Sequence, residues 1–170
     1  KAFIRQDFLQ YYRYTQKWVD IFEENSSMIA IESNHYIKGM HNLMGAHFNL
    51  GNYKKLNDSL IQFEKFSNSK TVQQNHNNLI QCFIYHTISL LNKHFISGQF
   101  SEGLLLVKGI EEKLKEYELY LDRHRILVIY YKIASMYFGA GNFEMAIDYL
   151  NKIINWKVDL RSDLQCYARL

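Results

Sequence analysis

The clearest hydrophobic pattern lies between residues 130 and 154, where apolar positions recur with the period of a helix. One face of the first half carries apolar or small residues three and four positions apart: Tyr130, Ile133, Ala134 and Tyr137. The face resumes after Gly141 and Asn142 with Phe143, Ala146, Ile147, Leu150, Ile153 and Ile154. The pattern predicts two amphipathic helices folded back on each other through Gly141, with Ala134 and Ala146 at their contact.

The same period continues along most of the chain and is interrupted at polar or glycine-containing stretches. It predicts helices over residues 3–24, 27–50, 53–66, 71–97 and 101–121, a helix from 122 into the hairpin, and one over 160–170. We expect four of them to be capped by Asn52, Thr71 (a capping box with Gln74), Ser101 and Asp122. The chain has no proline and only 8 glycines, so it lacks most of the turn-forming residues that a β fold needs between its strands. The sequence therefore predicts an all-α fold.

A glycine followed two residues later by an aromatic residue marks three expected bends: Gly51-x-Tyr53, Gly98-x-Phe100 and Gly141-x-Phe143. The last of these hairpins resembles the tetratricopeptide repeat. That family's pattern runs in this order: large aromatic, Leu, small residue, Tyr, Gly-x-aromatic, Ala, aromatic or Leu, and Ala. The corresponding positions here are Tyr130, Ile133, Ala134, Tyr137, Gly141, Phe143, Ala146, Leu150 and Ile153. Only Ile153 departs from the expected small residue. The bends are about 47 and 43 residues apart, longer than the family's period of roughly 34.

The resemblance implies a right-handed α-α superhelix of antiparallel helix hairpins, a solenoid that forms a single domain over residues 1–170. Its expected parts are an N-terminal helix over 1–26, three repeats over 27–68, 71–121 and 122–157, and the start of a truncated fourth repeat over 159–170. A lone hairpin cannot hide both of its apolar faces, so each repeat would bury them against its neighbours.

The resemblance also implies that the first helix of each repeat lines a concave groove that binds a protein or peptide partner. The groove positions carried over from the family are Lys38, His41, Phe48, Asn49, Tyr85, Ile88, Asn92, Phe95, Val128, Tyr131, Ser135 and Phe138. Lys38 and Asn92 alone do not reproduce the order of Lys, Asn and Arg that the family's carboxylate clamp needs. Phe48, Phe95 and Phe138 share one repeat position, and two interpretations stay open for them: packing against adjoining helices, or contact with a ligand.

The charge, the cysteines and the lengths of the apolar runs limit which partners and which cellular compartment the sequence predicts. The net charge is +3, and basic and acidic residues are interspersed without a run of five like charges. This distribution is typical of a solvated surface rather than a nucleic-acid-binding one. Cys82 and Cys166 fit no metal or disulfide spacing, which favours the cytoplasm. The longest apolar run, 126–131, falls far short of the ~18–20 residues of a membrane span, so we expect no membrane partner.

The ends of the chain indicate a fragment of a longer protein. It begins at Lys1 without methionine and stops at Leu170 inside an expected helix. A helix cut at this point exposes an apolar face, and we expect this face to favour self-association.

Candidate chemistry is sparse. Cys82 and His86 are four residues apart on one helical face, the spacing of a thiolate–imidazole pair, but no orienting group or oxyanion donor accompanies them. His86 and His94 would lie ~12 Å apart along a helix, too far for one metal ion with ~2 Å bonds. Glu32 with His35 supplies only two ligands. We therefore expect no catalytic residue, no metal site and no cofactor, in a protein that is not an enzyme.

These patterns predict a non-catalytic scaffold or peptide-binding module of a larger protein. The alternative is a regulatory domain that senses a peptide or another ligand and is attached to a DNA-binding or signalling module. The residues encoded before Lys1 and after Leu170 would distinguish the two. A helix-turn-helix or kinase pattern there would select the sensor, and further repeats would select the scaffold.

Overall fold

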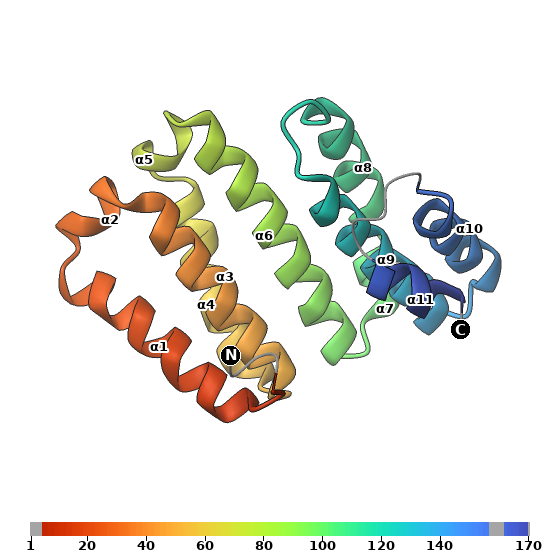
Figure 1. Cartoon of the computed structure of the whole chain (residues 1–170), viewed down its shortest axis with the longest axis horizontal. Helices are drawn as coiled ribbons and strands as arrows, with labels where there is room; N and C mark the ends of the chain where they lie inside the picture. Colours follow the sequence, from red (N-terminus) through yellow and green to blue (C-terminus); the bar gives the residue numbers. More distant parts are fainter. Residues whose placement is uncertain (1–4, 157–161, 170) are drawn as a thin grey trace. The chain divides into compact units, whose positions relative to one another are not determined.

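The computed structural model describes residues 5–156 and 162–169, which form helices and no strand. The helices are α1 (Phe8–Glu24), α2 (Ser27–Ile31), α3 (Ser33–Asn49), α4 (Tyr53–Ser67), α5 (Lys70–Gln73), α6 (His76–Ile96), α7 (Phe100–Leu104), α8 (Val107–Glu116), α9 (Arg123–Gly139), α10 (Phe143–Ile154) and α11 (Ser162–Arg169) (Figure 1). The prediction of an all-α fold is confirmed. Within the described ranges, no helix is both long enough and apolar enough to cross a membrane.

The chain divides into two compact units, Lys1–Ser89 and Leu90–Leu170, and the division falls inside α6. In the first unit, α1 packs against α3, and α3 packs against α4 (Figure 1). In the second unit, α9 contacts α7, α10 and α11, and α10 also contacts α11. The repeat bounds expected from the sequence stay predictions, and the bounds at 157 and 159 lie outside the described residues.

Three helices, α3, α6 and α9, end in the same backbone geometry. Gly51, Gly98 and Gly141 have φ values of 67°, 68° and 78°, a left-handed conformation that costs other residues about 1–2 kcal/mol. Each glycine N–H donates to the carbonyl three residues back: to Phe48 at 3.0 Å, to Phe95 at 3.1 Å and to Phe138 at 3.0 Å. The next N–H donates five residues back, to His47, His94 and Tyr137, at 2.9 Å in all three cases. This pair of bonds is the Schellman motif, and the predicted glycine bends are confirmed.

Side-chain caps fix where several helices begin. The side chains of Asn52 and Asp122 accept from the backbone N–H groups of Lys55 and His124, at 3.2 Å and 3.0 Å, so both predicted caps are confirmed. Asn142 caps α10 in the same way, accepting from the Met145 N–H at 3.2 Å. The first helix was predicted to begin near residue 3 but begins at Phe8, after the cap Asp7; residues 1–4 lie outside the described ranges.

Two predicted helices, 27–50 and 71–97, are each broken near their start. Glu32 separates α2 from α3 with a non-helical φ of -113° and ψ of 39°. The following Ser33 hydroxyl accepts a 2.8 Å hydrogen bond from Asn78 of α6, a tertiary contact that periodicity does not encode. The predicted cap Thr71 was wrong, because Thr71 lies inside the short α5. Asn75 caps α6 instead, and its side chain accepts from the Asn78 N–H at 3.1 Å.

The predicted helix over 101–121 is also broken. The predicted cap Ser101 was wrong, because α7 already begins at Phe100. Leu105 and Leu106 form the break, and their N–H groups donate to carbonyls only three residues back, in the manner of a tighter turn. Leu105 is 82% exposed, so its apolar side chain does not contribute to the core. The helix α8 then ends at Glu116, five residues before the predicted end.

In α4 and α10, a few side chains that were predicted to be buried are exposed instead. Helical spacing predicts that the inward face of the helix over 53–66 consists of Leu56, Leu60, Ile61 and Phe63. Leu56, Leu60 and Phe63 are buried, but Ile61 is 59% exposed. Ile61 lies ~140° around the helix from Leu56, on the opposite side. In α10, Ala146 and Ile153 are buried as predicted, whereas Ile147 and Phe143 are each 56% exposed. Tyr149 occupies the interior position instead, at 2% exposure.

The apolar face of α11 is covered within the second unit. Leu164 and Ala168 are buried in one cluster with Leu127 of α9 and Ile153 of α10. Tyr167 of the same helix is 59% exposed. Self-association through this helix stays a prediction.

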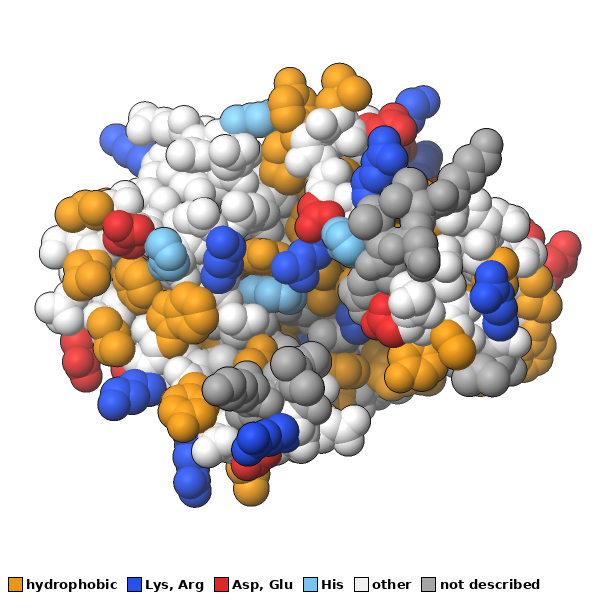
Figure 2. Space-filling model, viewed as in Figure 1, with side chains coloured by type: hydrophobic (Ala, Val, Ile, Leu, Met, Phe, Trp, Pro, Cys, Tyr) orange, Lys and Arg blue, Asp and Glu red, His pale blue; other side chains and the backbone are white. Residues whose placement is uncertain are grey.

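The protein surface carries both positively and negatively charged side chains. Figure 2 shows lysine and arginine side chains interspersed with aspartate and glutamate on the face in view, with exposed hydrophobic side chains between them. No region of this face is dominated by one sign, which agrees with the net charge of +3.

Candidate functional site

The residues predicted to line a groove differ widely in how accessible their side chains are. Lys38, Asn49, Phe95 and Phe138 are exposed, with Phe95 at 44% and Phe138 at 66%. The half-buried set is His41, Phe48, Val128, Tyr131 and Ser135. Tyr85, Ile88 and Asn92 of α6 are buried, at 5–6% exposure. A partner would therefore contact mainly the exposed and half-buried side chains, while Tyr85, Ile88 and Asn92 would lie beneath them.

In the first unit the structure brings two of these residues, His41 and Tyr85, into direct contact. The rings of His41 and Tyr85 are stacked, with centroids 4.0 Å apart and planes inclined by only 10°. The contact joins α3 to α6 and holds the half-buried imidazole flat against the phenol. The stacking buries apolar ring surface and fixes the orientation of the half-buried His41 ring relative to Tyr85.

In the second unit Asn92 contacts a residue that the sequence reasoning missed. The Lys132 ammonium of α9 donates a 2.5 Å hydrogen bond to the Asn92 side-chain oxygen. Burial lowers the pKa of Lys132 to about 8, because an ammonium group is less stable away from water. Lys132 lies beside the predicted groove residue Tyr131 in sequence. The available signal was its position as a lone cation in the apolar stretch from Ile126 to Phe138.

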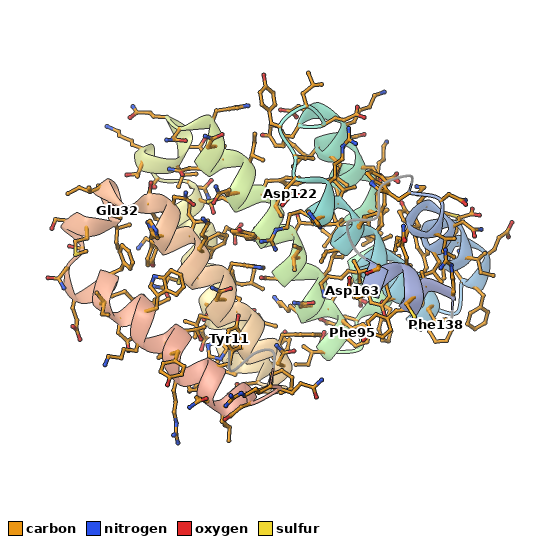
Figure 3. All side chains as sticks on the ribbon, in the orientation of Figure 1. Tyr11, Glu32, Phe95, Asp122, Phe138 and Asp163 are labelled. Carbon is orange, nitrogen blue, oxygen red and sulfur yellow. The ribbon has the colours of Figure 1, made fainter. Side chains whose placement is uncertain are left out.

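Phe95 and Phe138 stand at equivalent positions, each three residues before a glycine bend (Figure 3). Phe95 meets Phe100 edge-on with ring centroids 5.8 Å apart, and Phe138 meets Phe143 edge-on at 5.4 Å. Each phenylalanine thus packs against the aromatic residue that follows its own bend. Since about half of each side chain is still exposed, packing and ligand contact are compatible at this position.

The sequence candidate for catalysis, Cys82 with His86, lies on α6. Cys82 is 3% exposed. Burial raises the pKa of its thiol to about 11, partly offset by a hydrogen bond with Ser67. Burial likewise lowers the pKa of His86, with an opposing effect of Glu64. An activated thiolate needs the opposite shift, a lowered thiol pKa, so this environment favours an inert buried cysteine.

We expect Cys82 to resist thiol reagents in the native protein. In a Cys166→Ser variant, which removes the exposed cysteine, dithionitrobenzoate should react with Cys82 at least about 100-fold more slowly in buffer than in 6 M urea, because both burial and the protonated state protect the sulfur. The yellow thiolate product at 412 nm gives the rate. Rapid stoichiometric labelling of folded Cys166→Ser protein would restore the reactive-thiol interpretation.

His47 of α3 is a buried, uncharged histidine in the first unit. It is 2% exposed, its ring centroid lies 5.4 Å from that of Tyr12, and its Nδ1 has no hydrogen-bond partner among the described residues. Burial, with a smaller contribution from the Lys55 cation, lowers the pKa of His47 to about 4. The unfolded chain binds this proton near pH 6.5, so acid favours unfolding.

We therefore expect part of the acid sensitivity of this protein to depend on His47. As the pH falls from 7.5 to 5, protonation of His47 in the unfolded chain should remove about 2 kcal/mol of stability, and the loss should level off below pH 4. Urea denaturation at both pH values should show a smaller drop for His47→Gln than for the unchanged protein. Equal drops in the two proteins would mean that His47 is protonated as easily in the fold as outside it.

Metal-ligating side chains do not gather in the part of the chain that the structure describes: no three His, Cys, Asp or Glu residues lie close enough to hold an ion. Glu32 and His35 do form the pair that their spacing suggested, at 2.9 Å, and both side chains are more than half exposed. A two-residue surface pair of this kind contributes little to stability.

Comparison of the chain with protein-family models, with curated proteins and with solved structures finds no match.

Proposed function

We propose that this chain is a non-catalytic helical-repeat module of the tetratricopeptide type that binds a protein or peptide partner as part of a larger protein. The observation that carries the proposal is the recurrence of one bend geometry at Gly51, Gly98 and Gly141. Each bend follows a long helix and precedes a helix that begins with an aromatic residue. Recurrence of one hairpin unit along a chain is the sequence and backbone signature of a repeat array.

In this proposal the repeats stack as a right-handed superhelix, and their first helices, α3, α6 and α9, form the binding surface. The most accessible contributors are Lys38 and Asn49 in the first unit, and Phe95 and Phe138 in the second. Aromatic side chains with a few polar groups suit an extended peptide or an amphipathic helix, since the rings supply apolar contact area and the polar groups fix the register.

The assignment as a non-enzyme is supported by the environment of Cys82, which is buried and has a raised thiol pKa. The two free cysteines favour a reducing compartment, and we propose the cytoplasm on that ground.

The proposal can be tested by selecting binders from a library of random twelve-residue peptides and measuring each affinity by fluorescence anisotropy. The matched pair of variants is Phe138→Ala on the first helix of the last hairpin and Ile147→Ala on its second helix, because both side chains are more than half exposed. We expect Phe138→Ala to weaken binding about tenfold, the effect of a moderate interface hot spot, and Ile147→Ala to leave it unchanged.

Two results would contradict the proposal. One is a failure to enrich any peptide that binds saturably. The other is a set of peptides that lose affinity with Ile147→Ala and not with Phe138→Ala, which would move the binding surface to the second helices. Circular dichroism should first show that both variants keep the helical content of the unchanged protein.

A further inference from the structure

A cleft of about 420 Å³ opens in the second unit, away from the predicted groove residues. Its lining is Glu111, Leu114, Lys115, Glu118, Ile126, Tyr130 and Trp156. These residues come from α8 and the turn that follows it, from the first half of α9, and from Trp156, the second residue after α10. The volume falls in the range of ~300–1,000 Å³ typical of small-molecule and side-chain pockets.

One wall of the cleft is a carboxylate held in place by its neighbours. The Glu111 side chain accepts a 2.6 Å hydrogen bond from the hydroxyl of Tyr149, which is 2% exposed, and a 3.2 Å bond from Lys152. The Tyr149 bond, followed by the Lys152 contacts, lowers the pKa of Glu111. The carboxylate is therefore ionised at neutral pH and has a fixed orientation.

The same residues already hold a cation on an aromatic surface. The Lys152 ammonium lies 4.0 Å from the ring centroid of Tyr149 and 5.3 Å from that of Tyr130, while also pairing with Glu111. An ammonium group that lies over tyrosine rings and also pairs with a carboxylate is stabilised by both, because the ring faces and the carboxylate attract positive charge. Tyr130 belongs to both this internal pair and the cleft.

The cleft lining also contains a second aromatic residue, Trp156, and a second carboxylate, Glu118. Trp156 is half-buried against the Leu127 and Ile153 cluster, and its carbonyl accepts a 3.2 Å hydrogen bond from Gln165. Glu118 lines the cleft, and no basic side chain in the described part of the chain forms an ion pair with it. Lys115 is the single cation of the lining, against two carboxylates.

We propose that this cleft binds an organic cation, an alkylammonium or guanidinium group, between the rings of Tyr130 and Trp156 and the carboxylates of Glu111 and Glu118. Such a group occurs on the lysine and arginine side chains of a peptide and on free amines. Because the lining shares no residue with the predicted groove, the inference does not depend on the proposed function.

The test uses Trp156 as its own reporter. The chain has two tryptophans, so a Trp18→Phe background leaves Trp156 as the only one. Its fluorescence is titrated at constant ionic strength with tetramethylammonium chloride, with N-acetylated and C-amidated trilysine, and with the matching triglutamate. We expect saturable binding of at least one cationic probe with a Kd on the order of 1 mM, and no binding of triglutamate.

The decisive variant is Glu118→Gln, and its matched control is Glu116→Gln. Glu116 is an exposed glutamate two residues earlier that pairs with Lys113 at 2.7 Å and does not line the cleft. We expect Glu118→Gln to weaken binding of the cationic probe about two- to fivefold and Glu116→Gln to leave it unchanged. Both side chains are exposed, so neither change should disturb folding.

The two cationic probes distinguish between two kinds of ligand. Binding of tetramethylammonium supports a site open to small free cations, and binding of trilysine alone supports a site for the basic side chain of a peptide. Absence of saturable binding by either cation, binding of triglutamate, or equal weakening by the two glutamine variants would overturn the proposal.

Discussion

Replacing Phe63 with alanine is expected to lower the free energy of unfolding by about 3–5 kcal/mol. Phe63 is fully buried in α4, at 0% exposure, among the core residues of the first unit. Removing its ring loses the transfer free energy of a large apolar side chain and leaves a cavity that packed helices only partly close. The measurement is the urea denaturation midpoint and slope at pH 7.5, followed by circular dichroism.

The control for this change is Ile61→Ala in the same helix. Ile61 is 59% exposed, and its truncation should change the free energy of unfolding by no more than about 0.5 kcal/mol. The pair tests the orientation of α4, because the sequence pattern alone assigned both side chains to the interior. If Ile61→Ala proved the more damaging of the two, α4 would present a different face to the core.

Ile153→Ala should lower the free energy of unfolding by about 2–5 kcal/mol. Ile153 is at 0% exposure in the cluster where α9, α10 and α11 meet, together with Leu127, Leu164 and Ala168. Truncating it removes apolar contacts from three helices at once, so the docking of α11 should weaken as well. Hydrogen exchange of the α11 amides should therefore accelerate more than that of the α3 amides.

Ile147→Ala provides the matched comparison, since it is the same substitution in the same helix at a side chain that is 56% exposed. We expect a change of no more than about 0.5 kcal/mol. Similar losses for Ile147→Ala and Ile153→Ala would mean that α10 is rotated from the orientation described here. Because Ile147→Ala also serves as the control for peptide binding, its stability decides how that experiment is interpreted.

The candidate binding surface was only partly predictable. Periodicity located the first helices and the equivalent phenylalanines Phe95 and Phe138, because these follow from spacing along one helix. It could not identify the hydrogen bond between Lys132 and Asn92, whose residues are 40 positions apart in sequence. The cleft of Glu111, Tyr130 and Trp156 was missed for the same reason: its residues come from three segments that only folding brings together.

Local physical chemistry was enough to determine the helical class, the bends and several caps. Glycine is the residue that adopts a positive φ without strain, and Asn52, Asp122 and Asn142 cap helices through atoms within three residues of themselves. Such interactions need no distant partner, so the sequence determined them by itself.

Tertiary structure alone decided which apolar side chains are inside and where the long helices break. Phe143 and Ile147 fit the helical period as well as Ala146 and Ile153, yet Tyr149 is the residue buried with the latter two. Its hydroxyl can enter the interior because Glu111, 38 positions away, accepts its hydrogen bond. A helix has apolar residues on more than one side, and the neighbours that cover it, rather than its own spacing, determine the side that faces the core.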